Sequence, residues 1–539
     1  MGILEGLALA AALAPFLAGF LLSLARRFEA DAARRATAGA ALGTLFIAAA
    51  TCLLYGLGRL GIASGPDGLL SPSSSALLGV RIDGLSVLML ATVAPIGAVV
   101  ARYAIRYLDG DPRQARFSQW LAFTLSAVTL LAVSGDLILL LLSWLAASSG
   151  LHRLLLHRTD RPRAVVAARG RWLVGRAGDV CLAVAFALLA LGFGTTEIAE
   201  IVERTAAGEV PAGLSVIVGL IVLAAMTSTA QLPFHAWLPD SMETPTPVSA
   251  LMHAGLVNAG GYLLIRLSPV LVAASAALAV LAVVGCATAV FGATVMLVQT
   301  DVKRKLAYST ISQMGFMMLQ CGLGAFAAAG LHLIGHAYYK GYSFLSAGSQ
   351  IDPRAEVAAP PKALVPRLGL VLVGAGIGLA ALVSAASVLG IPLLEKPGFG
   401  VLAIVLLLGV TQVFLLPDAT GRAYAFARFE AAALGAGMAV SYLVGVSLIG
   451  RLLEPVLPAQ VGFFGLQGAP FAAALCLVFL AVWIFQEFAV RGGIGSTRRA
   501  LYVHAQNGFY LAMLQRRVVD RLWGPAEVTH HRGENASWA

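Results

Sequence analysis

Apolar runs of about 20 residues, separated by short polar or Pro/Gly-rich stretches, recur along the whole chain. A run of this length lets an α-helix cross the hydrocarbon core of a bilayer. A transmembrane β-barrel would instead show shorter segments in which apolar and polar residues alternate. The pattern therefore predicts an all-α polytopic membrane protein with about fifteen transmembrane helices. The predicted spans are 7–24, 36–58, 83–101, 118–133, 137–156, 173–193, 213–231, 246–266, 271–298, 306–324, 327–348, 368–391, 399–416, 431–450 and 469–489.

The composition favours the same class of protein. Hydrophobic residues make up 59% of the 539 residues and charged residues only 12%, whereas a soluble domain has about 25% charged residues. No basic segment precedes the first apolar run, and Arg26 and Arg27 follow it, so we interpret it as a retained span and not as a signal peptide. The five cysteines stand singly without a CxxC pair, which argues against a metal site in this chain.

The Lys and Arg residues between the spans predict the orientation, because inner loops of membrane proteins are enriched in these residues. The bias is consistent if the N-terminus lies outside and the C-terminus lies in the cytoplasm. It also accounts for the net charge of +10, so no nucleic-acid partner is needed. The basic inner segments are then 26–35, 102–116, 153–171, 303–305, 354–367, 422–428 and the tail 491–539.

Three titratable residues stand at intervals of four in the apolar segment 331–348 (LHLIGHAYYKGYSFLSAG). This spacing stacks His332, His336 and Lys340 on one helix face, about 6 Å apart along the axis. An ionisable group at membrane depth costs about 2.5–3.5 kcal/mol on insertion scales, which disfavours lipid-facing positions for all three. The row therefore predicts a buried path for protons or ions.

A second unusual segment covers residues 228–266 (STAQLPFHAWLPDSMETPTPVSALMHAGLVNAGGYLLIR). Proline removes a backbone donor and disfavours helix at the residue before it, so the span ending near Gln231 should break before a new helix starts around Val248. His253 lies early in that new helix. It is either a part of the path or a histidine that only bonds across helices. The prolines of the predicted broken helix are Pro233, Pro239, Pro245 and Pro247.

Other polar residues near the spans are weaker candidates for supporting the path. Arg176 and Asp179 stand three apart, a spacing that also fits an ion pair with a purely structural role. Lys305 lies next to a predicted span, and the inner-loop bias alone can explain it. The supporting candidates are Asp136, Arg176, Asp179, Glu243 and Lys305.

The motifs in residues 229–266, together with QTDVKRKLAYSTISQMGFM and HLIGHAYYKGYSFLSAGS, resemble the antiporter-like subunits shared by respiratory complex I and the Mrp sodium/proton antiporters. The resemblance covers roughly residues 80–350. It implies two inverted five-helix repeats with broken helices, and a row of Lys and His that conducts protons. Matched by motif, His253, His332, His336 and Lys340 form that row here.

The chain departs from these subunits at a charged couple. The family pairs a Glu after a Trp with a Lys before the broken helix, and here those positions are Leu145, after Trp144, and Ser228. Loss of both charges is physically coherent, because loss of one alone would leave an unpaired buried ion. The family's later Lys has no counterpart in 368–392.

The segment after Trp144 (LAASSGLHRLLLHRTDRPRAVVAARGRWLVGRAGD) resembles the membrane subunit of Dab-type inorganic carbon pumps. That resemblance implies a bacterial inner-membrane protein with a peripheral partner, DabA, which carries the zinc. No cofactor is then expected in this chain, and catalysis is expected in the partner. The alternatives are a cation/proton antiporter subunit of the Mrp kind and a proton-pumping subunit of an NADH-quinone oxidoreductase. The predicted divisions are N-terminal helices 1–117, the conducting core 118–350, C-terminal helices 351–490 and the basic tail 491–539.

Overall fold

The computed structural model describes residues 3–24, 30–59, 79–350, 367–391, 397–415, 424–458, 468–491 and 496–524. Parts of the predicted inner loops and of the basic tail lie outside these residues. The described chain consists of helices and turns, with two isolated β-bridges. The α-helices are α1 (Ile3–Leu24), α2 (Ala30–Arg59), α3 (Gly84–Tyr107), α4 (Gln114–Ala132), α5 (Leu137–Leu155), α6 (Pro162–Phe193), α7 (Ile198–Ala206), α8 (Leu214–Ser228), α9 (Trp237–Asp240), α10 (Thr246–Ala254), α11 (Ala259–Arg266), α12 (Ser268–Val272), α13 (Ser275–Met296), α14 (Val302–Gly322), α15 (Phe326–Leu345), α16 (Arg367–Leu389), α17 (Pro397–Leu415), α18 (Tyr424–Leu453), α19 (Gly468–Arg491), α20 (Ser496–Gln506) and α21 (Leu511–Trp523).

Each predicted span overlaps helix in the described part of the chain. Nine candidate spans there are long and apolar enough to cross a membrane, and α1, α8 and α17 contain shorter apolar helices. The prediction of an all-α polytopic membrane fold is therefore confirmed. Helix α16 runs without a break from Arg367 to Leu389.

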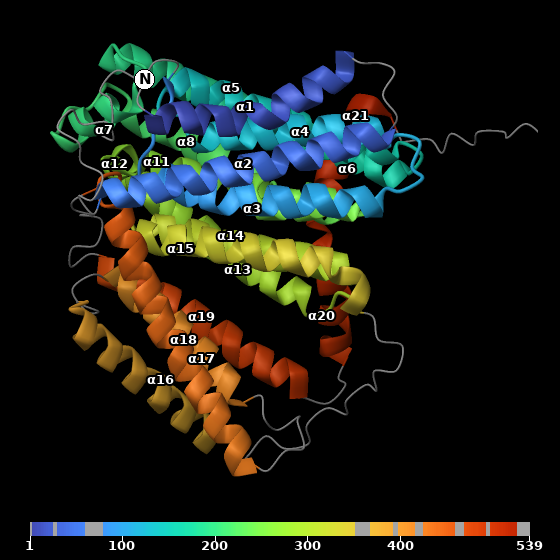
Figure 1. The fold of residues 1–539 in the computed structure, drawn as a ribbon. Coiled ribbons are helices and arrows are strands. Elements are labelled where there is room, and N and C mark those ends of the chain that lie inside the picture. The colour runs from blue at the N-terminus through green and yellow to red at the C-terminus, as the bar shows by residue number, and fades with distance from the viewer. Residues whose placement is uncertain are drawn as a thin grey trace, which may run out of the picture.

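The helices form layers, shown in Figure 1. Helices α1 to α8 make the upper part in this view, α13 to α15 lie below them, and α16 to α19 form a lower group that meets α15 through α18. The largest hydrophobic core runs through the first two of these layers. The layer of α13 to α15 therefore lies at the centre of the molecule.

Helices α13 and α14 pack backbone to backbone through glycines spaced seven residues apart. A Cβ atom added to Gly285 would lie 2.5 Å from the backbone nitrogen of Leu319, and one added to Gly322 would lie 2.4 Å from that of Ala282. Gly292 and Gly315 make equally close approaches. Small residues at such an interface let two membrane helices approach closely. Helix α14 is therefore held tightly against α13.

The helix at the proline-rich segment is interrupted twice. Helix α8 ends at Ser228, and the chain passes through a turn and the short α9 before α10 begins at Thr246, with Pro247 in its first turn. A second interruption follows at Gly255, where the 3-10 turn Leu256–Asn258 separates α10 from α11. The predicted span 246–266 is a candidate membrane span in the structure, and Gly255, with its non-helical backbone conformation (φ −121°, ψ −72°), divides it into two helices.

The tail helices α20 and α21 cross one end of the bundle, on the right in Figure 1. The side chain of Arg516 forms two hydrogen bonds with the carboxylate of Asp240, at 2.5 and 3.1 Å. The ring of Trp523 meets that of Trp172 edge to face, with centroids 5.6 Å apart. The described part of the predicted basic tail is thus helical and attached to α6 and α9.

Candidate ion path

Helix α15 carries the titratable row toward the interior of the bundle. Lys340 is fully buried, and His336 is 3% exposed. His332 lies one turn earlier, and its ring centroid is 6.3 Å from that of His336. The row faces α10, α11 and α14, which pack against α15. The structure thus places the three predicted residues on one helix face, where His336 and Lys340 are buried and His332 is half-buried.

His336 is held by the broken helix. Its Nδ1 lies 3.1 Å from Oδ1 of Asn258, which is in the turn between α10 and α11. The amide nitrogen of Asn258 donates to the carbonyl oxygen of Ala254 at 3.0 Å, so the amide oxygen faces the histidine. In neutral His336, Nδ1 then carries the hydrogen, which leaves Nε2 able to accept a proton.

His332 connects the row to α14 and α18. Its Nδ1 lies 3.0 Å from Oε1 of Gln320, and the same glutamine forms a side-chain hydrogen bond with Tyr442. Three helices therefore meet through polar side chains at His332, the N-terminal end of the row. Such groups exchange hydrogen bonds without adding a fixed charge.

Lys340 is bound only by neutral partners in the described part of the chain. Its Nζ donates to Oγ of Ser309 at 2.7 Å and to the carbonyl oxygen of Leu306 at 3.3 Å, both on α14. The described residues contain no salt bridge to Lys340. A serine hydroxyl can accept from an ammonium group or donate to a neutral amine. Ser309 can therefore bind Lys340 in both protonation states.

His253 lies on α10 beside the row and is completely buried. Its ring stacks on Phe344, with centroids 4.3 Å apart, and neither ring nitrogen has a hydrogen-bond partner among the described residues. A buried donor without a partner costs about 1–3 kcal/mol. Helix α10, which carries His253, packs against α15. The structure therefore places all four predicted path residues on two neighbouring helices.

The supporting candidates are spread over other parts of the molecule. Asp136 caps α5 by accepting hydrogen bonds from the backbone of Ile138 and Leu139. Glu243 pairs with Arg161 at 3.1 Å, near the start of α6. Lys305 is exposed in the first turn of α14. None of these three side chains contacts the row in the described structure.

Arg176 and Asp179 form an ion pair within α6, with Nη2 and Oδ2 2.5 Å apart. The indole nitrogen of Trp144 on α5 donates to Oδ1 of Asp179 at 2.9 Å. Leu145, the position where the antiporter-like subunits have Glu, is next to this tryptophan and partly buried. The charge on Asp179 is thus engaged by α5 and by its own helix.

Sequence reasoning missed a second buried ion pair and several neutral groups. Arg266 at the end of α11 pairs with Asp83, which caps α3, and also donates to Oγ of Ser86 at 3.0 Å. Among the neutral groups, polar amides inside apolar runs were the available signal, because such residues are rare in spans and bond across helices. The missed neutral groups are Asn258, Ser309, Gln320 and Tyr442. Within the described ranges, no three His, Cys, Asp or Glu residues gather as a metal-binding group.

A polytopic helical bundle with a buried row of titratable groups beside a broken helix defines a class of membrane transport protein. The family model described as "NADH:quinone oxidoreductase/Mrp antiporter, TM" matches residues 134–416, and that of the "NADH-Ubiquinone oxidoreductase (complex I), chain 5 N-terminus" matches 71–118. The chain belongs to this antiporter-like family of multi-pass membrane proteins.

Individual relatives narrow the comparison. The chain is 37% identical over 478 residues to the probable inorganic carbon transporter subunit DabB2 of Halothiobacillus neapolitanus, which covers 86% of this chain and 83% of that protein. It is 41% identical over 275 residues to the probable subunit DabB of Hydrogenovibrio crunogenus, covering 51% of this chain and 53% of that protein. The resemblance to Dab-type membrane subunits is confirmed by these relatives.

A solved structure supports the same fold. The Mrp complex from Dietzia sp. matches with a TM-score of 0.55 and 27% identity, and the match covers 97% of this chain. This chain spans 57% of the length of that Mrp chain.

Proposed function

We propose that this protein is the ion-conducting membrane subunit of an energy-coupled complex that takes up inorganic carbon. The observation that supports this most is the row of His332, His336 and Lys340 on α15, with His253 beside it, in a chain similar to DabB2 over most of its length. Ionisable groups inside a membrane bundle are costly to bury, and those that occur usually mark ion or proton pathways. No cofactor is proposed for this chain.

In the proposed mechanism, protons or sodium ions move down their gradient through the row. A proton can pass between neighbouring groups because Nε2 of His336 is free to accept one and Ser309 binds Lys340 in either protonation state. One charge crossing 100 mV releases about 2.3 kcal/mol, and a concentration gradient adds to this. The movement changes the conformation of a bound DabA-like partner.

The partner is proposed to carry out the chemistry. A zinc ion held by the partner would supply an activated water, with which CO2 would give bicarbonate and a proton. Ion flow through this chain makes that conversion run in one direction. The complex is proposed to lie in the bacterial inner membrane, with the C-terminus of this chain in the cytoplasm.

The test is rescue of a bacterial strain that lacks carbonic anhydrase and does not grow in air. Expression of this chain together with its DabA-like partner should restore growth, whereas each protein alone should not, because conduction and hydration reside in different chains. Growth is measured in air and in CO2-enriched gas, where all strains should grow. Rescue by this chain alone would contradict the proposal.

The second candidate function is that of a cation/proton antiporter subunit, favoured by the match to the Mrp complex. Its test uses a sodium-sensitive strain without antiporters. Restored sodium tolerance, without any effect on growth in air, would favour this function over carbon uptake.

A further inference from the structure

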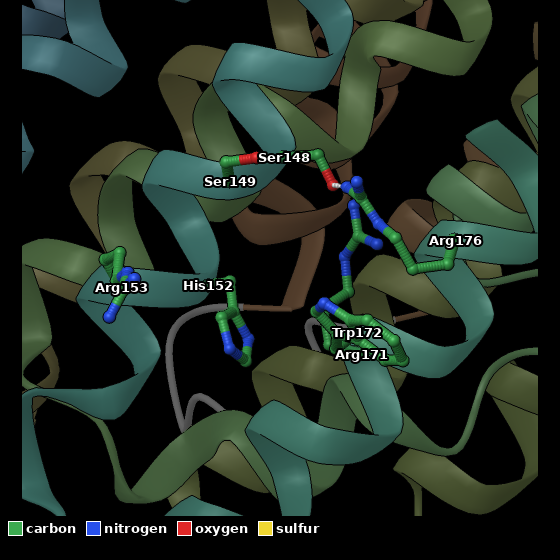
Figure 2. Close-up of a pocket in the computed structure, with 7 residues that line it drawn as sticks. All are labelled: Ser148, Ser149, His152, Arg153, Arg171, Trp172 and Arg176. Carbon is green, nitrogen blue, oxygen red and sulfur yellow. Dashed lines mark hydrogen bonds between the residues drawn. The ribbon is translucent and has the colours of Figure 1, made fainter.

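A cavity with a volume of 180 Å³ opens between α5 and α6, away from the row on α15. Figure 2 shows side chains from both helices turned toward it. Its walls carry hydrogen-bond donors and cationic groups, and no carboxylate lines it. The polar lining residues are Ser148, Ser149, His152, Arg153, Arg171 and Arg176.

Arg171 contributes to this cavity a guanidinium group that has no salt-bridge partner among the described residues. The residue is 7% exposed. Its guanidinium lies 4.9 Å from the ring centre of Trp237, and its Nε has no hydrogen-bond partner among the described residues. A cation buried near a membrane without an anion is unfavourable. The position therefore calls for a negative partner.

Gly175 makes room for the guanidinium of Arg171. A Cβ atom at this glycine would lie 2.1 Å from Nη1 of Arg171 and 3.6 Å from Oγ of Ser148. The side chain of Arg171 thus runs along its own helix to Gly175, four residues later in the chain, and its guanidinium reaches toward α5. Figure 2 shows the guanidinium groups of Arg171 and Arg176 close to Ser148.

The carboxylate of Asp179, on the same helix as Arg171, is already engaged. Asp179 pairs with Arg176 at 2.5 Å and accepts from Trp144, while Nη2 of Arg176 donates to Oγ of Ser148 at 3.1 Å. Nδ1 of His152 lacks a hydrogen-bond partner within the described residues. Arg171 and Arg176 therefore share one carboxylate, which leaves an excess of positive charge beside the cavity.

We propose that this cavity binds a small oxyanion, and that the anion is bicarbonate. Arginine donors match the oxygen atoms of a planar oxyanion with two parallel hydrogen bonds. The hydroxyl of Ser148 accepts from Arg176 and can donate its own hydrogen to the anion, whereas that of Ser149 already donates to the carbonyl oxygen of Leu145. The oxyanion chemistry follows from the lining, whereas the choice of bicarbonate rests on the proposed function. The cavity lies in the half of the molecule that the Lys and Arg bias predicts to be cytoplasmic, where the product of CO2 hydration would accumulate.

The experiment measures thermal unfolding of the purified full-length chain in nanodiscs of a zwitterionic lipid. Sodium bicarbonate is titrated at pH 8, with sodium chloride keeping the ionic strength constant. A ligand that binds only the folded state raises the melting temperature with increasing concentration. We expect bicarbonate to do so, and Arg171→Gln to weaken the apparent affinity about tenfold or more, because a charge-assisted hydrogen bond is lost.

The matched control is Arg163→Gln, because Arg163 is 85% exposed and lies outside the cavity, 3.8 Å from Glu243. It should keep the bicarbonate response of the unmodified chain. If Arg171→Gln does not fold, Ser148→Ala and Gly175→Ala replace it, and each should weaken the response.

Three results would overturn the proposal. They are no bicarbonate response in the unmodified chain, an unchanged response in Arg171→Gln, and a phospholipid phosphate in the cavity. The last would appear as an anionic lipid retained in native mass spectra and lost in Arg171→Gln. Since this assay needs no partner, it separates the two proposals. Bicarbonate binding without rescue in air would contradict only the proposed carbon uptake. Rescue without bicarbonate binding would contradict only the proposed anion site in the cavity.

Discussion

Lys340 and Arg266 are both buried cations, yet their surroundings differ in kind. Arg266 faces the carboxylate of Asp83, whereas Lys340 faces a hydroxyl and a carbonyl oxygen. A buried ion pair holds its charge in place, because removal of one partner leaves the other uncompensated. A lysine among neutral acceptors can change its protonation state without leaving an orphaned anion. Lys340 is therefore suited to transfer and Arg266 to structure.

Replacing Lys340 by Met should abolish carbon uptake while the complex still assembles. Methionine keeps the length and apolar stem of the side chain, and it removes a charge whose burial is unfavourable. The melting temperature should therefore stay the same or rise. Growth in air and co-purification with the partner are the measurements.

Lys362→Met, in a predicted inner loop outside the described residues, is the matched control and should support growth. An assembled Lys340→Met complex with full uptake would show that the lysine only connects helices.

At the residue scale, the titratable members of the site could be predicted from the sequence, and the neutral polar members could not. His332, His336 and Lys340 stand out in an apolar segment, and their spacing on one helix face follows from helix geometry. Asn258 and Ser309 do not stand out, because amides and hydroxyls also occur in spans for structural reasons. Their role depends on which helix lies opposite, and that is a property of tertiary packing.

At the scale of elements, only one of the two interruptions in the broken helix could be predicted from the sequence. The prolines between Gln231 and Val248 predict an interruption because they remove backbone donors. Gly255 gave no such warning, since glycine is common inside membrane helices. The second interruption turns Asn258 toward His336, so the less visible break is the one that reaches the row.

Asn258→Leu should reduce conduction strongly and lower the melting temperature. Leucine is close to asparagine in size but cannot accept from Nδ1 of His336, and an unsatisfied buried donor costs about 1–3 kcal/mol. Ion uptake into proteoliposomes and thermal unfolding are the measurements.

Asn507→Leu is the control for that substitution. Asn507 makes the same kind of bond, from Nδ2 to the carbonyl oxygen of Val503 at 2.8 Å, but lies in the tail. If both variants conduct alike, the contact between Asn258 and His336 does not matter for the path.

At the scale of the whole molecule, segments that the charge distribution predicts to lie on the inner side of the membrane also contact one another in the structure. The tail helices meet the start of α6 and the segment around Asp240, all on the side that the Lys and Arg bias predicts to be inner. That the tail folds back onto this end could not be predicted, because a basic composition fits a solvated segment equally well.

Reporter fusions should place the two ends of the bundle on opposite sides of the membrane. A fluorescent protein fused after Ala539 should fluoresce in the cytoplasm, and a phosphatase inserted after Gly208, between α7 and α8, should be active in the periplasm. The reverse pattern would mean that the orientation is inverted. Both reporters on one side would mean that the number of spans between them is wrong.

The glycine contacts between α13 and α14 restrict which helices of the protein can move relative to each other. Ser309 and Gln320 both belong to α14, so the hydrogen-bond partners of Lys340 and His332 are carried by one helix that is held tightly against α13. The backbone contacts of Gly285 and Gly322 leave no space for α13 and α14 to slide along each other, so a conformational change would have to move these two helices as one unit. Ser309 and Gln320 would then travel together and keep their spacing along the row.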